Sequence, residues 1–86
     1  MRIDISQLKK ILKKLKKKDF ALFEAVRKKI NQIAKLDREA IGHFKNLRAP
    51  LDEYKRVHVG SFVLTFKLEG DIIVFGKIKH HDEAYR

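Results

Sequence analysis

The sequence predicts an α+β fold in which a short N-terminal strand and a helical hairpin pack on an antiparallel β-sheet that ends in a three-stranded meander. In the first half of the chain, apolar residues recur every three or four positions, which is typical of amphipathic helices. In the second half they alternate with polar residues, which is typical of half-buried strands. The 86 residues are expected to form one domain, residues 1–86, because the chain is too short for a second core.

The first half carries the patterns of the strand and of the two helices. Residues 2–5 alternate as a strand does, and Ser6 is the expected N-cap of the helix that follows. Leu8 begins this amphipathic helix, which reaches to about Lys16, and Asp19 caps a second helix. The apolar stripe of the second helix is Phe20, Phe23, Val26, Ile30, Ile33 and Ala34. Because only a few residues join the helices, they are expected to pack antiparallel as a hairpin.

Between the helices and the sheet the periodic pattern weakens. Residues 37–44 are expected to add a short helical piece. Residues 46–52 contain the only proline, Pro50, and predict a linker. Leu47 and Leu51 are expected to hold this linker against the core.

Three consecutive runs predict the meander. Residues 55–59 and 62–68 alternate apolar and polar side chains, and residues 72–79 form a further β-rich run. Residues 60–61 and 69–71 join these runs, and each link contains a glycine that suits a tight turn. Strands joined so closely pair antiparallel. One face of the sheet then packs against the helices, and the other is available to a ligand.

Positive charge is concentrated in the first part of the chain. There are 21 Lys and Arg against 11 Asp and Glu, a formal net charge of +10. Residues 1–50 hold fifteen Lys or Arg and five Asp or Glu, whereas residues 51–86 hold six of each kind. Seven lysines lie on the polar face of the first helix: Lys9, Lys10, Lys13, Lys14, Lys16, Lys17 and Lys18. This asymmetry favours a polyanionic partner over a merely solvated lysine-rich face.

The composition excludes several classes of protein. Without cysteine there is no disulfide, no thiolate nucleophile and no cysteine-ligated zinc site. No apolar run reaches the roughly 20 residues of a membrane span, and no signal-peptide pattern begins the chain. The lysine-rich helix is not expected to lie on a membrane, because its apolar face lacks Trp and Phe and is needed for the core. A soluble cytoplasmic protein is expected.

The candidate chemistry lies in the last third of the chain. This part holds three of the four histidines, His58, His80 and His81, and both tyrosines, Tyr54 and Tyr85. A strand that ends in titratable groups holds them on a rigid support. Because adjacent strand residues face opposite ways, only one of His80 and His81 is expected in a site. His81 is favoured, and His80 is the second candidate.

A metal site is not expected. His43 has no carboxylate or histidine at ligand spacing and is interpreted as a surface residue. His80, His81 and Asp82 are contiguous, so their side chains diverge on a strand, and their spacing fits no common zinc pattern. The sequence therefore predicts no metal and no other cofactor.

Two stretches of the second half resemble a known family. They are LRAPLDEYKRVHVG, residues 47–60, and IKHHDEAY, residues 78–85. With the order of elements, they are similar to the RelE/ParE superfamily, the toxins of type II toxin–antitoxin systems. The resemblance implies a RelE-like enzyme that cleaves mRNA in the ribosomal A site without a metal, or a ParE-like protein that inhibits DNA gyrase. The final His-His-Asp-x-x-Tyr pattern looks more like the ribonuclease branch.

The resemblance implies roles for single residues. Arg56 and His58 fall where RelE-like toxins place basic residues, and His81 falls where they often have arginine or histidine. Tyr85 matches a tyrosine that closes the active site. Val63 departs from the family, because many members carry an arginine there that stabilises the transition-state phosphate.

Metal-free cleavage of RNA needs two proton transfers and a cation. The 2′-hydroxyl attacks the phosphorus, so a base must take its proton and an acid must protonate the leaving 5′-oxygen; histidine suits both steps. We expect His81 as the acid and His58 as the base, or the reverse. Arg56 would stabilise the charged phosphate, since its guanidinium binds phosphate oxygens bidentately. Tyr85 would orient the scissile nucleotide by stacking or hydrogen bonding.

The expected partners follow from the same resemblance. They are a RelB-like antitoxin, the ribosome and mRNA, with no membrane; the free toxin is expected to be a monomer and the antitoxin-bound form a hetero-oligomer. The seven lysines, with Lys55 and Lys79, are expected to contact RNA phosphates, and Arg56 or Lys79 to replace the missing arginine. The alternatives are a gyrase-inhibiting toxin without catalysis and a basic nucleic-acid-binding module.

Overall fold

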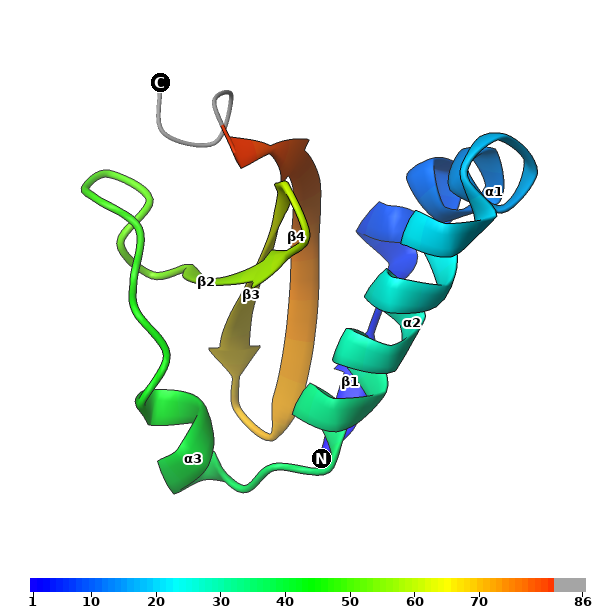
Figure 1. The fold of residues 1–86 in the computed structure, drawn as a ribbon. Coiled ribbons are helices and arrows are strands. Elements are labelled where there is room, and N and C mark those ends of the chain that lie inside the picture. Colours follow the sequence, from blue (N-terminus) through cyan, green and yellow to red (C-terminus); the bar gives the residue numbers. More distant parts are fainter. Residues whose placement is uncertain (82–86) are drawn as a thin grey trace.

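The elements follow one another in the order that the sequence predicts. A computed structural model describes residues 1–81; Asp82 and Tyr85, which entered the predictions, lie outside this range. The elements are β1 (Arg2–Asp4), the 3₁₀ turn η1 (Ser6–Leu8), α1 (Lys9–Lys18), α2 (Phe20–Ala34), α3 (Arg38–Gly42), β2 (Lys55–Val59), β3 (Phe62–Glu69) and β4 (Ile72–His80) (Figure 1). The predicted α+β class is confirmed.

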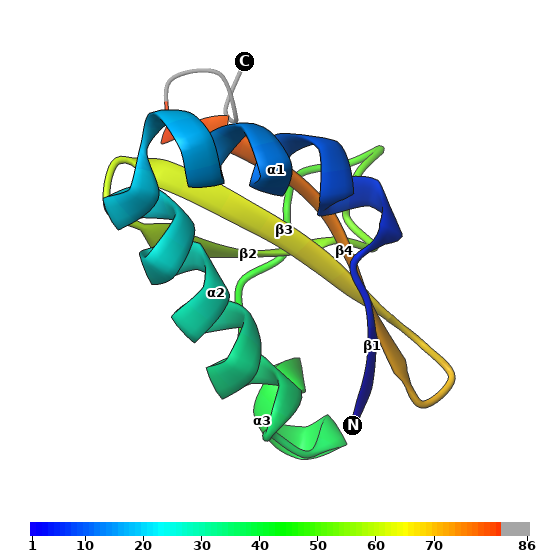
Figure 2. The same ribbon diagram turned by 90° about the vertical axis from the view of Figure 1, so that its right-hand side faces the viewer.

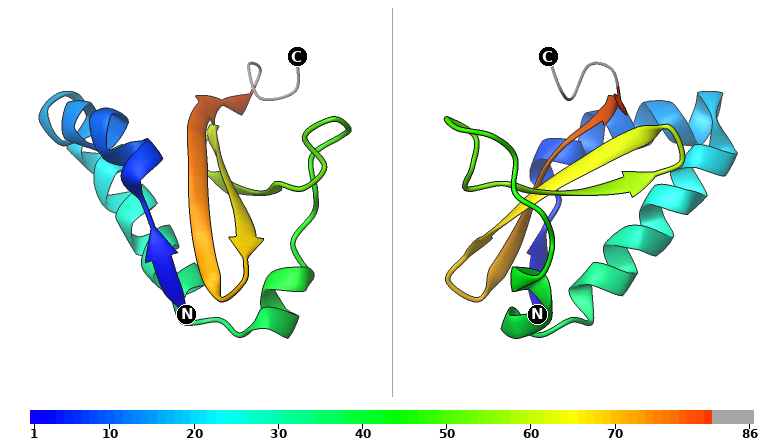
Figure 3. Two further views of the ribbon diagram at one scale, coloured as in Figure 1. Left: turned by 180° about the vertical axis from the view of Figure 1, so that it is seen from behind. Right: turned by 60° about the vertical axis from the view of Figure 1, so that its left-hand side comes forward.

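The four strands form one sheet in the order β1-β4-β3-β2. Strands β2, β3 and β4 are the predicted antiparallel meander. Strand β1 pairs parallel with β4, with Arg2 opposite Ile72, so the sheet as a whole is mixed (Figure 3). Gly60 and Gly70, in the two meander turns, both have φ of 59°, a left-handed conformation that glycine adopts without steric cost.

Helices α1 and α2 cover one face of this sheet. They meet at Asp19 and diverge from it in a V across the strands (Figure 2). The buried core between helices and sheet consists of Leu8, Val26, Ile30, Ile33, Ile41, Val59, Leu64, Phe66, Ile73 and Phe75. No residue of α1 is fully buried: Ile11 and Leu12 are half-buried against this core, and all seven lysines are exposed. Helix α1 therefore lies on the rim of the core and presents its charge to solvent.

The caps are partly as predicted. The Asp19 carboxylate accepts a hydrogen bond from the Leu22 N–H (3.1 Å), which confirms this cap. Ser6 is not an N-cap, because it lies inside the 3₁₀ turn and its N–H donates to the Asp4 carboxylate (2.9 Å). The hydrogen bonds that Asp4 accepts from Ser6 lower the pKa of that carboxyl. Neither the 3₁₀ turn nor α1 has a side-chain N-cap hydrogen bond, so the predicted serine cap is wrong.

Two predicted core contacts are wrong. Phe20 is 57% exposed, because it begins α2 at the tip of the V, where its ring lies beside that of Phe23 (centroids 5.8 Å apart). Leu51 is 53% exposed. Its N–H bonds to the Arg48 carbonyl and its own carbonyl accepts from the Tyr54 N–H, so this part of the linker closes on itself rather than on the core.

No helix within residues 1–81 is long and apolar enough to cross a bilayer.

Candidate functional site

The face of the sheet turned away from α1 and α2 carries the candidate site, and we call it the site face. Alternation along the strands places Arg56, His58, Val63, Thr65 and Lys79 on it. The pairing aligns them across the meander: Arg56 is opposite Thr65, His58 is opposite Val63, and Val63 is opposite Lys79. The side chains predicted for one site on β2 and β4 therefore share one surface.

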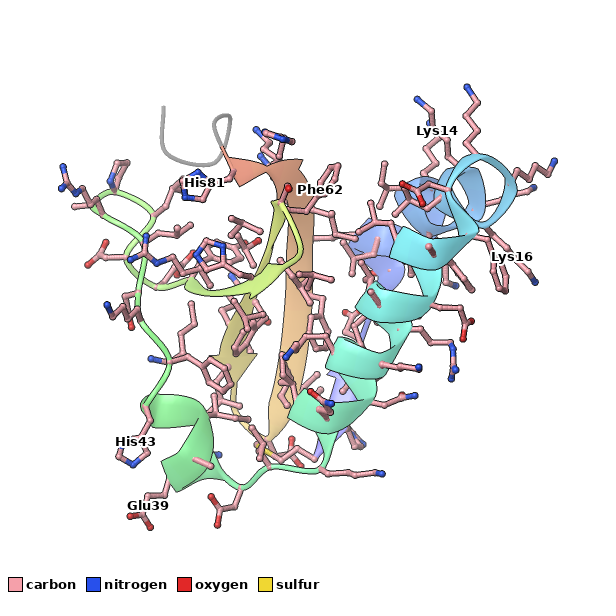
Figure 4. All side chains as sticks on the ribbon, viewed as in Figure 1. Lys14, Lys16, Glu39, His43, Phe62 and His81 are labelled. Atoms are coloured by element: carbon pink, nitrogen blue, oxygen red, sulfur yellow. The ribbon has the colours of Figure 1, made fainter. Side chains whose placement is uncertain are left out.

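Two of the predicted histidines lie against each other. The rings of His58 and His81 stack with their centroids 5.3 Å apart and their planes inclined by 26°. The backbone N–H of His81 donates a hydrogen bond to the backbone carbonyl of Ser61 (2.8 Å), which ties the end of β4 to the turn between β2 and β3. Figure 4 shows His81 at the upper end of the sheet, on the side facing the linker. Both histidines are solvent-exposed and accessible to a substrate.

A bulge in β4 decides which histidine joins His58. Phe66 is opposite Phe75, but Leu64 is opposite Ile78, so β4 has one more residue than β3 between these pairs. Phe75 and Ile78 both pack toward the core although they are three positions apart, an odd spacing that strict alternation would place on opposite faces. Beyond the bulge the alternation is therefore inverted. Lys79 and His81 consequently face the site, and His80 faces the helices.

Thr65 and Gly76 hold the bulge in place. The Thr65 hydroxyl oxygen accepts a hydrogen bond from the Lys77 N–H (2.9 Å), a donor that lies at the register shift. A Cβ atom on residue 76 would lie 2.9 Å from that oxygen and 3.0 Å from Cε1 of Tyr54. Glycine at this position therefore lets both side chains close over the strand.

Tyr54 joins the linker to the site face. Its ring lies against Gly76 on one side, and the Lys67 ammonium lies 5.1 Å from the ring centroid, within the range of a cation–π contact. Glu69 (2.9 Å) and Glu53 (3.5 Å) pair with the same ammonium, and the hydrogen bond to Glu69 above all raises the pKa of Lys67 to about 12. Sequence reasoning missed this cluster, because its residues are far apart in the chain. The break in alternation among Ile73, Phe75 and Ile78, with glycine at the break, indicates only the bulge against which Tyr54 packs.

An apolar residue, Val63, lies between His58 and Lys79 on the site face. Val63, where the family often has arginine, is 1% exposed. Arg56 is half-buried beside them, and Lys79 is exposed. Lys55 points elsewhere: its ammonium donates to the Phe44 carbonyl (3.3 Å) and to Asn46 Oδ1 (2.9 Å), so it fastens the start of the linker.

The remaining candidates lie outside this group. His80 packs against Phe62 on the helix side of the sheet, with centroids 5.4 Å apart. His43 is exposed at the end of α3, as predicted, at the opposite end of the molecule from His81 (Figure 4). Tyr85 lies outside the described residues. Among residues 1–81, no three His, Asp or Glu side chains come together in a way that could hold a metal ion.

A helical pair over a four-stranded mixed sheet that ends in an antiparallel meander is a RelE-like α+β arrangement. The relative "Putative toxin RelE4" of Methanocaldococcus jannaschii is 40% identical over 82 residues, which cover 92% of this chain and 83% of that protein. An uncharacterised protein of Methanosarcina mazei is 34% identical over 83 residues, covering 93% and 92% of the two chains. No family model and no solved structure matches. The chain belongs to the RelE toxin family.

Removal of the Thr65 hydroxyl is expected to loosen the bulge. In Thr65→Val the Lys77 N–H loses its acceptor, which costs about 1 kcal/mol of folding stability, and its amide hydrogen exchanges faster with solvent. The nuclear Overhauser effect between the His58 and His81 rings weakens, because the end of β4 is no longer fixed in register. Thr65→Ser keeps the oxygen and is the matched control. If Thr65→Val retains the wild-type exchange rate and ring contact, the hydroxyl does not hold the bulge.

Proposed function

We propose that this protein is the toxin of a type II toxin–antitoxin system and that it inhibits translation in the cytoplasm by cleaving mRNA on the ribosome. The observation that carries the proposal is the stacked pair of His58 and His81 on a face that also holds Arg56 and Lys79. Membership in the RelE family supports the toxin role. The geometry supports acid–base chemistry at this pair.

The proposed reaction is an internal transfer of the phosphate. One histidine takes the proton of the 2′-hydroxyl, whose oxygen then attacks the adjacent phosphorus. The bond from phosphorus to the 5′-oxygen breaks, and the other histidine donates a proton to that leaving oxygen. The products are a 2′,3′-cyclic phosphate and a 5′-hydroxyl. We assign the base to His58 and the acid to His81, or the reverse, because both rings lie at one place on the site face.

The phosphorane formed in this reaction needs a positive partner. Val63 supplies none, so we assign the charge to Lys79 on β4, which is opposite Val63, and to Arg56 on β2, which is opposite Thr65 and on the same face. Preorganised cations of this kind stabilise negative charge as it develops in the transition state. Tyr85 would contribute by orienting the scissile nucleotide, a role that stays a prediction from the family resemblance.

The lysines of α1 are the proposed docking surface for ribosomal RNA. All seven are exposed, and α1 carries no acidic residue that would neutralise them. Phosphate contacts by such lysines give affinity that does not depend on base sequence. The same surface suits the proposed RelB-like antitoxin, whose acidic segment would fold on binding. The free toxin would then be a monomer and the inactive form a hetero-oligomer.

Cleavage of a defined mRNA in the A site tests the reaction. Purified protein added to programmed ribosomes is expected to leave 2′,3′-cyclic phosphate ends. His81→Ala and His58→Ala each lower the rate by about 10²- to 10⁴-fold, the usual contribution of a general acid or base. His43→Ala, an exposed histidine far from the site, is the control and keeps the wild-type rate. A folded, antitoxin-free protein that leaves the mRNA intact would reject this reaction and favour the gyrase-inhibiting alternative.

Neutralising α1 is expected to weaken ribosome binding rather than chemistry. With Lys9, Lys13 and Lys16 changed to Gln, the slope of log affinity against log salt falls by about 2 to 3, since each lost phosphate contact removes about 0.7 to 0.9. The single-turnover rate at saturating ribosomes stays near that of the wild type. Changing Lys28, Lys35 and Lys45 to Gln removes the same charge outside α1 and serves as control. Equal slopes for both triple variants would show that α1 is not the docking surface.

A further inference from the structure

His80 is a titratable side chain that the proposed reaction does not use. Its ring meets that of Phe62 edge to face, with centroids 5.4 Å apart and planes inclined by 79°. His80 is exposed, and Phe62 is only half-buried and does not belong to the hydrophobic core. Core packing therefore does not account for this aromatic pair.

The pair lies between the proposed catalytic pair and the lysine surface. The bulge turns His80 toward the helices while His81, the next residue, faces the site. Figure 4 shows Phe62 at the upper end of the sheet on the side of α1, and His81 at the same end on the opposite side. Consecutive Cα atoms are about 3.8 Å apart. His80 and His81 are therefore adjacent along the chain and lie on opposite faces at the same end of the sheet.

We propose that His80 and Phe62 form a stacking subsite for an unpaired RNA nucleotide next to the scissile one, on the path toward α1. This inference rests on the proposed function and names a further contact with the same substrate. Flat rings at a strand end bind the face of any base, so the contact does not depend on base identity. Lysines on α1 would hold the phosphates that follow, and the base would lie on the rings between them.

The chemistry favours RNA over a protein segment at this position. An acidic antitoxin segment would be attracted to the lysines, but its carboxylates gain nothing from stacking on the His80 and Phe62 rings. A nucleotide offers both a phosphate for the lysines and a base for the rings. The test therefore asks whether a ring at residue 80 is needed for binding RNA.

The experiment measures binding to ribosomes programmed with an mRNA whose A-site codon is 2′-O-methylated and so cannot be cleaved. His80→Ala is expected to bind about 10-fold more weakly, within the range of one lost base-stacking contact. His80→Tyr keeps a ring and restores binding. Phe62→Leu keeps the apolar bulk without the ring and binds more weakly as well. His43→Ala binds as the wild type does.

On cleavable mRNA, His80→Ala is expected to raise the half-saturating concentration about 10-fold and to leave the rate at saturation unchanged. Wild-type binding by His80→Ala would overturn the subsite. So would a fall in the saturated rate as large as that of His81→Ala, because His80 would then act in the chemistry. Weaker binding of a RelB-like antitoxin with unchanged RNA binding would assign the rings to the antitoxin and also overturn it. Ring-dependent binding by a protein that cleaves nothing would uphold the subsite and reject the proposed reaction.

Discussion

The hydrogen bond from the Lys77 N–H to the Thr65 hydroxyl holds the extra residue of β4 on which both faces of the sheet depend. If the strand kept all its residues but did not bulge, pairing in β4 would continue in register from Phe75, and Lys77 and Lys79 would face the core while Ile78 faced water. Burying unpaired ammonium groups costs far more than a local kink in one strand. The bulge is therefore the arrangement that keeps Ile78 in the core, and it places Lys79 and His81 beside His58.

The two faces of the sheet are stabilised by different means. The helix side is held by apolar packing around Phe66 and Phe75, and none of the charged residues among residues 1–81 is buried there. The site face is held by polar and aromatic contacts: Tyr54 lies on Gly76, and Lys67 lies over the tyrosine ring between two glutamates. This second arrangement leaves the histidines and Arg56 at the surface. It fixes the strands beneath them, as proton transfer to one phosphate requires.

Much of the fold could be predicted from the sequence, because periodicity reports which face of an element is buried. The helices, the Asp19 cap and the meander follow from it. The partner of β1 could not be predicted, since a strand of three residues carries no pairing information of its own. Ser6 and Phe20 were misplaced for local reasons: Ser6 lies inside a 3₁₀ turn that precedes α1, and Phe20 lies at the tip of the V beyond the sheet.

The candidate site was harder to predict than the fold. Alternation sufficed to place Arg56 and His58 on one face. It gave no secure choice between His80 and His81, because that choice depends on a bulge, and a single extra residue inverts every later position. The spacing of Ile73, Phe75 and Ile78 indicates the bulge, because these apolar residues are two positions apart before it and three positions apart across it. The Tyr54 contact with Gly76 joins residues far apart in the chain, and local pattern does not report it.

The central claim is that His58 and His81 act as one catalytic unit. The most direct measurement is a double-mutant cycle on the single-turnover rate of mRNA cleavage at saturating ribosomes, with His58→Ala, His81→Ala and both together. If the two histidines serve one concerted transfer, the double variant is about as slow as the slower single variant. Losses that multiply in the double variant, or a single variant with the wild-type rate, would contradict the claim.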